Sequence, residues 1–577
     1  MPRKVTFILS NKVKRPWWQT AIGYQIYPRS FYDSNGDGIG DINGIRQKLP
    51  HLHQLGVNLL WICPFFVSPM DDYGYDVKDY LQVDPSFGSL EDFQALLNEA
   101  HTLGIRIMID LVLNHTSDEH RWFMEARKNR YSKFHNYYLW KDPKVTDEGK
   151  ILPPNNWRGY FSDSAWQYDE TVKQYYLKIF SKKMPDLNWE NPAMRQEMYA
   201  IARYWLDLGV DGFRLDALAH LAKDLTYTDS MLPVDQDGLV LDASKFSNLP
   251  RVFDYLKEFK TQVLEAYPEA LTIGEVGGGV SPEASLAYVH PQQGSLNMVF
   301  NFDTCWENGA FGSDTKADHE LKTNVLQLKN NFMKWYHAVA PQASLPIYWL
   351  NHDHPRVVSQ YGSIRYRRES ATMLITTLLF LYGTPFIYNG EEIGMSNVDY
   401  EKLTQFKDVS AMQYAKQASS RLDEPTILRF LRRTSRVNAR TPFQWSDAPH
   451  AGFTQGEPYL QLNGNYQAVN LAAQKRDPKS IFHYYRQAIA LRKQPAITET
   501  VLSGTLSLVD PLNPDVFAYR HEGRPSLMVI SNFRSYEVNF KLEVVINAVR
   551  LHNYPTIEKR GLNLVLRPFE TYLLDVE

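Results

Sequence analysis

Eight short apolar runs, separated by stretches with helical periodicity, organise most of this 577-residue chain. Between the runs lie segments such as 90–104 and 191–209, in which apolar residues recur at helical spacing above a polar face. Strands that alternate with helices predict a parallel sheet, and eight of them favour a closed (β/α)8 TIM barrel of the α/β class. The predicted strands are 22–28, 57–66, 105–115, 210–216, 271–275, 296–303, 347–353 and 384–392.

A Rossmann-like open sheet is the alternative architecture for such a pattern. That fold needs a Gly-rich phosphate turn after its first strand. The residues that follow 22–28 hold no such turn, so the barrel is the favoured interpretation.

The rest of the chain predicts additional domains around the barrel, which we assign to residues 1–115 and 179–498. Trp, Tyr, Asn and Pro in irregular order make 116–178 an insertion domain after the third strand, and 396–465 an irregular insertion after the eighth. Short alternating runs predict a C-terminal antiparallel β domain over 499–577.

Three of the apolar runs end at a carboxylate, namely Asp216, Glu275 and Asp353. Because strands of a TIM barrel present catalytic groups at their C-terminal ends, these three acids should share one pocket. Cleavage of a glycosidic bond with retention needs two carboxyl groups about 5 to 5.5 Å apart. Arg214 points to the same side as Asp216 and can keep it ionised, which favours Asp216 as nucleophile and Glu275 as acid.

Four ordered motifs carry a family resemblance: DLVLNH at 110–115, GFRLD at 212–216, IGE at 273–275 and NHD at 351–353. Together they resemble the signature regions of the α-amylase superfamily, glycoside hydrolase family 13. Further segments, among them YQIYPRSFYDSNGDGIGD at 24–41 and ARTPFQW at 439–445, extend the likeness over nearly the whole chain. Within the superfamily the chain looks like the exo-acting α-glucosidases, oligo-1,6-glucosidases in particular. The resemblance implies a small oligosaccharide as substrate.

The resemblance also implies a role for each matching residue. Asp216 would be the nucleophile, Glu275 the acid and base, and Asp353 the residue that grips sugar hydroxyls. An ion pair of Asp72 with Arg440 would close the pocket behind the terminal glucose and enforce exo action. The residues that would surround that glucose are the aromatics Tyr75, Phe161 and Phe180, which stack on it, and the hydrogen-bond donors His115 and His352.

Linkage specificity is less defined by the sequence. The residue after the nucleophile is typically Val in α-1,6-acting relatives and Thr in α-1,4-acting ones, but here it is Ala217, which leaves room for either linkage. An α-1,4-glucosidase, a transglucosylase and a trehalose-6-phosphate hydrolase therefore remain alternatives. The segment 302–314 lacks a recognisable sucrose-isomerase motif, which disfavours isomerisation. A non-catalytic scaffold of amino-acid transporters is disfavoured by the complete acid triad and the missing membrane anchor.

A separate loop holds Asp33, Asn35, Asp37, Ile39 and Asp41, which match the first nine positions of an EF-hand loop, with the Ile39 carbonyl as a ligand. The twelfth position is Gly44 instead of Glu, so this is no true EF-hand. Related α-glucosidases carry Ca²⁺ in this loop. We predict a structural calcium ion here, without a part in catalysis.

Composition narrows the partners and the compartment. The net charge of −3 and the lack of a basic stripe argue against nucleic acid as a partner. No apolar run approaches the ~20 residues of a membrane span, and the run after Met1 is too short for a signal peptide, so we expect a cytoplasmic protein. Cys63 and Cys305 are interpreted as small buried hydrophobes without a disulfide.

Overall fold

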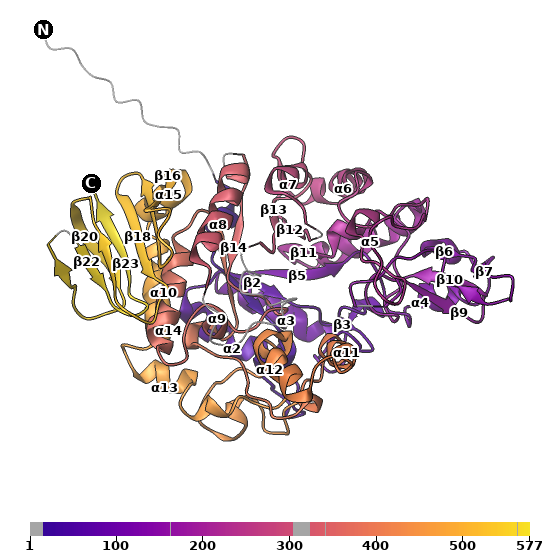
Figure 1. Ribbon diagram of the computed structural model, residues 1–577, viewed down its shortest axis with the longest axis horizontal. Coiled ribbons are helices and arrows are strands. Elements are labelled where there is room, and N and C mark those ends of the chain that lie inside the picture. Colours follow the sequence, from indigo (N-terminus) through magenta and orange to yellow (C-terminus); the bar gives the residue numbers. More distant parts are fainter. Residues whose placement is uncertain (1–14, 162, 278, 304–322, 341, 562) are drawn as a thin grey trace, which may run out of the picture.

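Eight parallel strands form the central sheet of the computed structural model, which describes residues 15–161, 163–277, 279–303, 323–340, 342–561 and 563–577 (Figure 1). Around the sheet the strands follow chain order, with β13 and β14 at its two ends. The two end strands are in contact, and the hydroxyl of Tyr348 in β14 donates a 2.5 Å hydrogen bond to the carbonyl of Asn301 beside β13, so the barrel is nearly closed. The predicted TIM barrel is therefore confirmed. Its strands are β1 (Gly23–Ile26), β2 (Leu59–Ile62), β5 (Arg106–Val112), β11 (Gly212–Asp216), β12 (Leu271–Glu275), β13 (Met298–Phe300), β14 (Pro346–Tyr348) and β15 (Thr384–Tyr388).

Most of these strands are shorter than the apolar runs that predict them. The largest difference at a C-terminal end concerns β14, which ends at Tyr348, five residues before Asp353. The chain then turns, and the backbone N–H of Asp353 donates to the side-chain oxygen of Asn351 at 2.8 Å. Asp353 is thus held by a turn beyond the strand, although its place on the C-terminal side of the barrel is as expected.

Side chains fill the interior of the barrel. Trp61, Met108, Ile273, Phe300 and Phe386 belong to one buried cluster contributed by the inner strands. A glycine at position 23 is required by this packing, because a Cβ there would lie 2.4 Å from the ring of Phe386. The barrel is thus a packed core, and the chemistry must lie at its rim.

Helices cover the outside of the barrel as the crossover pattern requires. The helix α3 begins with a capping box, in which Ser89 and Asp92 each accept a backbone hydrogen bond from the other. The helices are α1 (Pro28–Phe31), α2 (Ile42–Leu55), α3 (Leu90–Thr102), α5 (Pro192–Asp207), α6 (Arg251–Gln262), α7 (Pro282–Val289), α8 (Val325–Val339), α9 (Val357–Gln360), α10 (Arg367–Leu379), α13 (Leu471–Arg476), α14 (Ile481–Arg492) and α15 (Pro495–Ser503).

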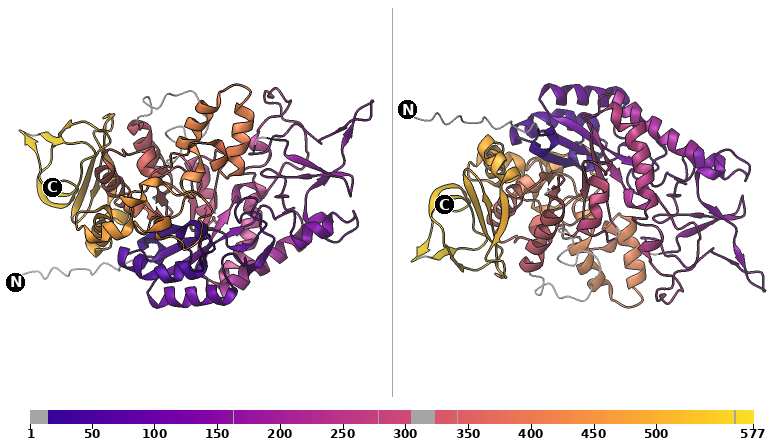
Figure 2. Two further views of the ribbon diagram at one scale, coloured as in Figure 1. Left: turned by 90° about the horizontal axis from the view of Figure 1, so that it is seen from below. Right: turned by 90° about the horizontal axis from the view of Figure 1, so that it is seen from above.

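The segment after β5 forms a small lobe at one end of the molecule, opposite the C-terminal domain (Figures 1 and 2). Its own core packs Trp157 and Trp166 against Phe246 from the loop after β11. A buried ion pair of 2.9 Å joins Asp186 to Lys223 and ties the lobe to the barrel rim. The elements here are α4 (Arg121–Ala126), the sheet β6 (Trp140–Lys141), β10 (Gln174–Leu177) and β9 (Trp166–Asp169), and the hairpin β7 (Lys144–Val145) and β8 (Ile151–Leu152); a separate pair, β3 (Phe66–Val67) and β4 (Asp79–Val83), follows β2.

The segment after β15 is more regular than predicted. It contains two helices, α11 (Val409–Ala418) and α12 (Glu424–Thr434), which pack on each other. Each starts at an aspartate whose side chain accepts a backbone N–H, Asp408 for α11 and Asp423 for α12. The buried positions of α11 are all alanines, so its apolar face is weak in the sequence, which explains why α11 was not predicted. The apolar face of α12, with Ile427, Leu428 and Leu431, was a signal that the prediction missed.

The C-terminal domain is antiparallel, as predicted, and packs mainly on α10, with further contacts to α8 and α15 (Figure 1). Nearly every residue of the second half of α10 is buried, because the helix lies between the barrel and this domain. Its strands form a five-stranded sheet of β16 (Thr505–Val509), β17 (Val516–Glu522), β18 (Ser526–Asn532), β23 (Thr571–Val576) and β20 (Ile546–His552), and a three-stranded sheet of β19 (Val538–Lys541), β22 (Asn563–Leu566) and β21 (Lys559–Arg560). Among the described residues, none of the helices is both long and apolar enough to span a bilayer.

Candidate active site

Asp216 and Glu275 are the last residues of the adjacent strands β11 and β12, and one arginine joins them. Arg214 donates from Nη1 to Asp216 Oδ1 at 2.5 Å, while its Nη2 lies 2.9 Å from Glu275 Oε2. Because a single guanidinium contacts both carboxyl groups, they must lie within several ångströms of one another. This proximity is compatible with the separation that a retaining glycosidase needs.

Arg214 is itself held in place by a residue of the neighbouring strand. Its Nη1 also donates to Asp110 on β5, and Asp110 accepts a 2.8 Å hydrogen bond from the indole of Trp61. Burial raises the pKa of Asp110 to about 6, although Arg214 and Trp61 act to lower it. The guanidinium therefore stands between three carboxyl groups in a buried environment, and its orientation is over-determined.

The electrostatics of Asp216 follow from this crowding. Burial raises the pKa of Asp216 well above its ordinary value, and the carboxyls of Glu275 and Asp110 add to the effect, while Arg214 opposes it. Arg214, which donates directly to Asp216, is therefore the contact that favours the ionised form of this carboxyl group.

Ala217 supplies a second contact to Glu275. Its backbone N–H donates to Oε2 at 2.9 Å, and its backbone is left-handed, with φ 48° and ψ 30°. Both donors therefore reach Oε2 of Glu275. The residue that the sequence marks for linkage specificity also orients this carboxyl group.

Asp353 lies between a histidine and two arginines. His352 Nε2 is 3.1 Å from Oδ2, and Oδ1 accepts from Arg440 Nη2 at 2.7 Å and from Arg436 Nη1 at 3.3 Å. Burial acts to raise the pKa of Asp353, but the guanidiniums of Arg440 and Arg436 outweigh it and hold the pKa far below its usual value. Asp353 is therefore ionised and available to accept hydrogen bonds from hydroxyl groups.

The predicted ion pair of Asp72 with Arg440 is wrong in its partner. Arg436 Nη2 contacts Asp72 Oδ1 at 2.6 Å, whereas Arg440 reaches Asp353 and the buried Asp408. Both arginines come from the turn after α12, four residues apart, so the sequence cannot tell which of them faces Asp72. The pair still joins the loop after β2 to the segment after β15.

The aromatic residues and histidines surround these acids. The ring of Tyr75 stacks on that of His352, with 5.2 Å between the ring centroids. A 2.7 Å hydrogen bond also joins the hydroxyl of Tyr75 to His352 Nε2. The ring of Phe180 contacts those of His115 at 5.4 Å and Phe161 at 5.9 Å.

The two histidines are both neutral. Burial lowers the pKa of His115 to about 3 and lowers that of His352 well below its usual value. Neutral imidazoles can serve as hydrogen-bond donors to hydroxyls without adding charge.

Comparison with known proteins decides the family. The catalytic-domain model of α-amylase matches residues 25–500. The chain belongs to the α-amylase family.

Oligo-1,6-glucosidase of Bacillus cereus is 41% identical over 574 residues, which cover 98% of this chain and 100% of that protein. Among solved structures, the isomaltulose synthase SmuA of Protaminobacter rubrum is similar with a TM-score of 0.90, 36% identity and coverage of 97% and 99%. Trehalose-6-phosphate hydrolase of Bacillus licheniformis has a TM-score of 0.88, 34% identity and coverage of 97% and 100%.

The sequence analysis did not single out three residues of the site in this α-amylase family member. Asp110 begins the DLVLNH motif, and its place on an inner strand opposite Arg214 was the available signal. Arg436 lies in the same short segment as Arg440, while Asp408 is buried in the segment expected to be irregular. Most of segment 302–314, where no sucrose-isomerase motif was recognised, lies outside the described residues, and so does Cys305. Cys63 is buried and forms no disulfide, as expected.

The loop predicted to hold calcium is folded on its own side chains. Asp33 accepts hydrogen bonds from the N–H groups of Asn35, Gly36 and Gly38, and Asp37 accepts from Ile39. Asp41 caps the start of α2. Within the described ranges no three acidic, histidine or cysteine side chains converge in a way that could hold a metal ion. The residues as placed form no ligand cage, and the calcium ion stays a prediction.

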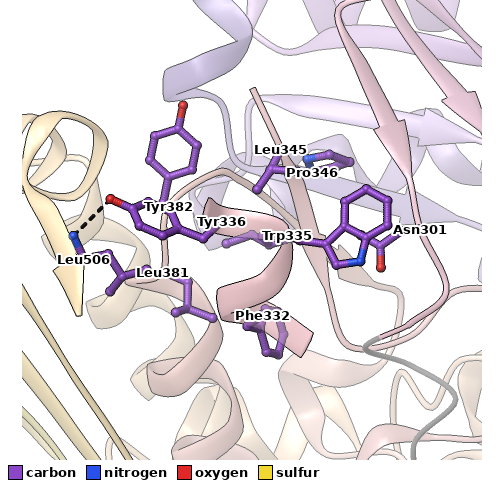
Figure 3. A pocket seen from close by; sticks show the side chains of 10 residues that line it. Asn301, Phe332, Trp335, Tyr336, Leu345, Pro346, Leu381, Tyr382 and Leu506 are labelled. Atoms are coloured by element: carbon purple, nitrogen blue, oxygen red, sulfur yellow. Dashed lines mark hydrogen bonds between the residues drawn. The ribbon is translucent and has the colours of Figure 1, made fainter. Parts of the chain in front are cut away.

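A small hollow of about 20 Å³ lies between α8, β14 and the start of the C-terminal sheet (Figure 3). Its walls are mostly apolar, and the hydroxyl of Tyr336 accepts the backbone N–H of Leu506 at 3.1 Å. Tyr382 donates to carbonyls at the end of α8. The hollow is therefore part of the seam between two domains of this family member.

Proposed function

We propose that this member of the α-amylase family is a retaining, exo-acting α-glucosidase that releases α-glucose from the non-reducing end of short α-glucosides. Isomaltose and isomalto-oligosaccharides are its proposed main substrates. The observation that carries the proposal is the Arg214 guanidinium, which contacts Asp216 and Glu275 at the ends of neighbouring strands. The likeness to oligo-1,6-glucosidases over the whole chain supports the linkage.

The first chemical step forms a covalent intermediate. The carboxylate of Asp216 attacks C1 of the terminal glucose, the bond from C1 to the glycosidic oxygen breaks, and Glu275 gives its proton to the leaving oxygen. Arg214 supports this division of labour because it keeps positive charge beside the Asp216 oxygen that it contacts. The N–H of Ala217 holds the other carboxyl in the direction of the leaving group.

The second step hydrolyses the glycosyl ester. Glu275, now ionised, takes a proton from water, the water oxygen attacks C1, and the bond to Asp216 breaks. Two inversions at C1 give net retention, so the first product is α-glucose. Each step balances without any cofactor.

Exo action is supported by the far end of the pocket. Asp72 and Arg436 form a 2.6 Å ion pair there, with their side chains only 7% and 10% exposed. A charged pair that bridges two loops at this place would block further sugar units beyond the terminal glucose. Asp353 and the flanking aromatics would hold that glucose from its hydroxyl and C–H faces.

The test is a substrate panel with stereochemical detection. Purified enzyme is incubated with isomaltose, maltose, sucrose, trehalose and trehalose 6-phosphate, and products are followed by NMR. We expect α-glucose to appear first, with kcat/KM highest on isomaltose. Early β-glucose would overturn retention, and a preference for trehalose 6-phosphate or formation of sucrose isomers would overturn the substrate assignment.

Two further predictions accompany this function. The cytoplasmic location stays a prediction and is tested by fractionation of the source cells. The structural calcium ion likewise stays a prediction, and its proposed role is confined to the loop that holds Asp33 and Asp41.

A further inference from the structure

Asp408 is a fully buried carboxylate that none of the reaction steps uses. Its two oxygens have separate partners. Oδ1 accepts hydrogen bonds from the N–H of Ala411, at 3.0 Å, and from the hydroxyl of Ser410. Through Oδ1, Asp408 therefore caps the start of α11. Oδ2 accepts Arg436 Nε at 2.8 Å and lies 3.7 Å from Arg440 Nη1. One residue therefore caps a helix and contacts both arginines of the pocket.

The other ends of those arginines contact the substrate-facing acids. Arg436 reaches Asp72 with Nη2 at 2.6 Å and Asp353 with Nη1 at 3.3 Å. Arg440 contacts Asp353 with Nη2 at 2.7 Å. Because a guanidinium is planar and rigid, fixing its Nε on Asp408 also fixes the directions in which its terminal nitrogens point.

Charge explains why a carboxylate is needed at this position. Two guanidiniums lie side by side in a buried region, and each disfavours the charge of the other. Burial acts to raise the pKa of Asp408, but Arg436 and Arg440 outweigh it and hold the pKa below its usual value. Asp408 is thus ionised and neutralises part of this charge through nitrogens other than those that contact Asp72 and Asp353.

We propose that Asp408 is a positioning residue, which holds Arg436 and Arg440 so that Asp72 and Asp353 keep their places in the pocket. The inference rests on the proposed α-glucosidase function and adds a residue that acts through two others. The competing explanation is that Asp408 serves only as the cap of α11.

Asp408→Asn separates these two roles. Asparagine caps helices as well as aspartate does, so the start of α11 is preserved. With its amide oxygen on Ala411, however, the new NH2 group faces Arg436 Nε, donor against donor. We expect kcat/KM on isomaltose and on p-nitrophenyl α-glucoside to fall about 100-fold, with KM raised and kcat lowered, and the melting temperature unchanged within a few degrees.

Two controls exclude a loss of activity that comes from misfolding or from any substitution in this segment. Active sites are counted by trapping with a fluorinated α-glucosyl fluoride, so that kcat refers to folded enzyme. Asp399→Asn is the matched control, because Asp399 pairs with Arg432 at 3.0 Å in the same segment but is 89% exposed, and its kinetics should stay within twofold. If Asp408→Asn folds poorly, Asp408→Ser is used in its place, because serine also caps helices but has a smaller side chain.

The double variant with Arg436→Ala completes the test. If Asp408 acts through Arg436, Asp408→Asn should cost at least tenfold less in that background than in the wild type. Wild-type per-site constants in Asp408→Asn, or a full additional loss in the double variant, would overturn the inference. An inactive wild type would instead overturn the proposed function, so the two failures are distinguishable.

Discussion

At the scale of single residues, Arg214 decides how two neighbouring carboxyls can take different parts in one reaction. It contacts Asp216 and Glu275 together, and the N–H of Ala217 adds a donor to Glu275 alone. The two acids therefore differ in their hydrogen bonds although they lie side by side. The order of Arg214 and Asp216 along one strand was readable from the sequence, because residues two apart point the same way.

Replacing the nucleophile should stop turnover. In Asp216→Asn the amide cannot form the glycosyl ester, and we expect kcat to fall by at least four decades, about 5 kcal/mol of barrier. Glu275→Gln should spare p-nitrophenyl α-glucoside more than isomaltose, because a good leaving group needs little protonation. Kinetics on both substrates check the pair. Hydrolysis by Asp216→Asn within tenfold of wild type would contradict the nucleophile assignment.

Ala217 links specificity to backbone conformation. Its φ of 48° is costly for a β-branched side chain, so Ala217→Val should lower the melting temperature, whereas Ala217→Gly should not. We also expect Ala217→Val to shift the ratio of isomaltose to maltose hydrolysis toward isomaltose, by about 1 to 3 kcal/mol at most. Melting curves and the two kcat/KM values test this. An unchanged ratio would assign linkage to other loops.

At the scale of elements, the sequence predicted the eight barrel strands and the acids that follow three of them. It did so because a buried parallel strand leaves an apolar run, and a barrel puts all strand ends on one face. The contacts of Arg436 and Asp408 were beyond such reasoning. They depend on how the segment after β15 folds over the loop after β2, and no periodic pattern records a contact between two loops.

The ion pair between these loops can be tested at its arginine. Arg436→Ala leaves Asp72 buried without its partner and frees the end wall of the pocket. We expect kcat/KM on isomaltose to fall at least 100-fold, because an unpaired buried charge is costly and the terminal glucose loses its end stop. Arg432→Ala, which removes an exposed pair of the same segment, serves as control. Equal activity in both variants would contradict the role of the pair.

The loop of Asp33 to Asp41 allows a test of the predicted calcium ion. Gly38 has φ 91° and donates to Asp33 Oδ2 at 2.7 Å, so hydrogen bonds within the chain support the tight turn. We expect dialysis against EDTA to leave kcat unchanged, and added calcium to raise the melting temperature, an effect that Asp37→Ala should remove. A melting temperature that ignores calcium would reject the ion; a loss of kcat with EDTA would reject its purely structural role.

At the scale of the whole molecule, three units depend on contacts that only the folded chain creates. The buried helix α10 lies between barrel and C-terminal sheet, and Thr377 on it donates to Ser531 at 2.7 Å. The insertion lobe is tied by the ion pair of Asp186 with Lys223. The polar groups at these domain contacts are buried on folding. The free energy of unfolding therefore depends on their charge, and so on pH.

The stability of the whole molecule should fall as the pH rises toward 8, because of one buried acid beneath the rim. Burial raises the pKa of Glu391, after β15, to about 8, and the neighbouring Glu392 adds to the shift against the N–H of Tyr388. Among the described residues its Oε2 has no hydrogen-bond partner. In the unfolded chain the same carboxyl ionises near its ordinary value of 4.5. A raised folded pKa means that its contribution to stability is complete below about pH 4.5 and is lost as the pH rises through about 8.

Glu391→Gln removes this titration and keeps the shape of the side chain. We expect the apparent melting temperature of the wild type to fall more steeply than that of the variant between pH 5.5 and 8.5, a relative change of a few kcal/mol. Glu401→Gln, at an exposed position, is the control and should follow the wild type. Parallel curves for wild type and Glu391→Gln would mean that Glu391 is ionised in the folded protein, held by the guanidinium of Arg356, which already acts to lower its pKa.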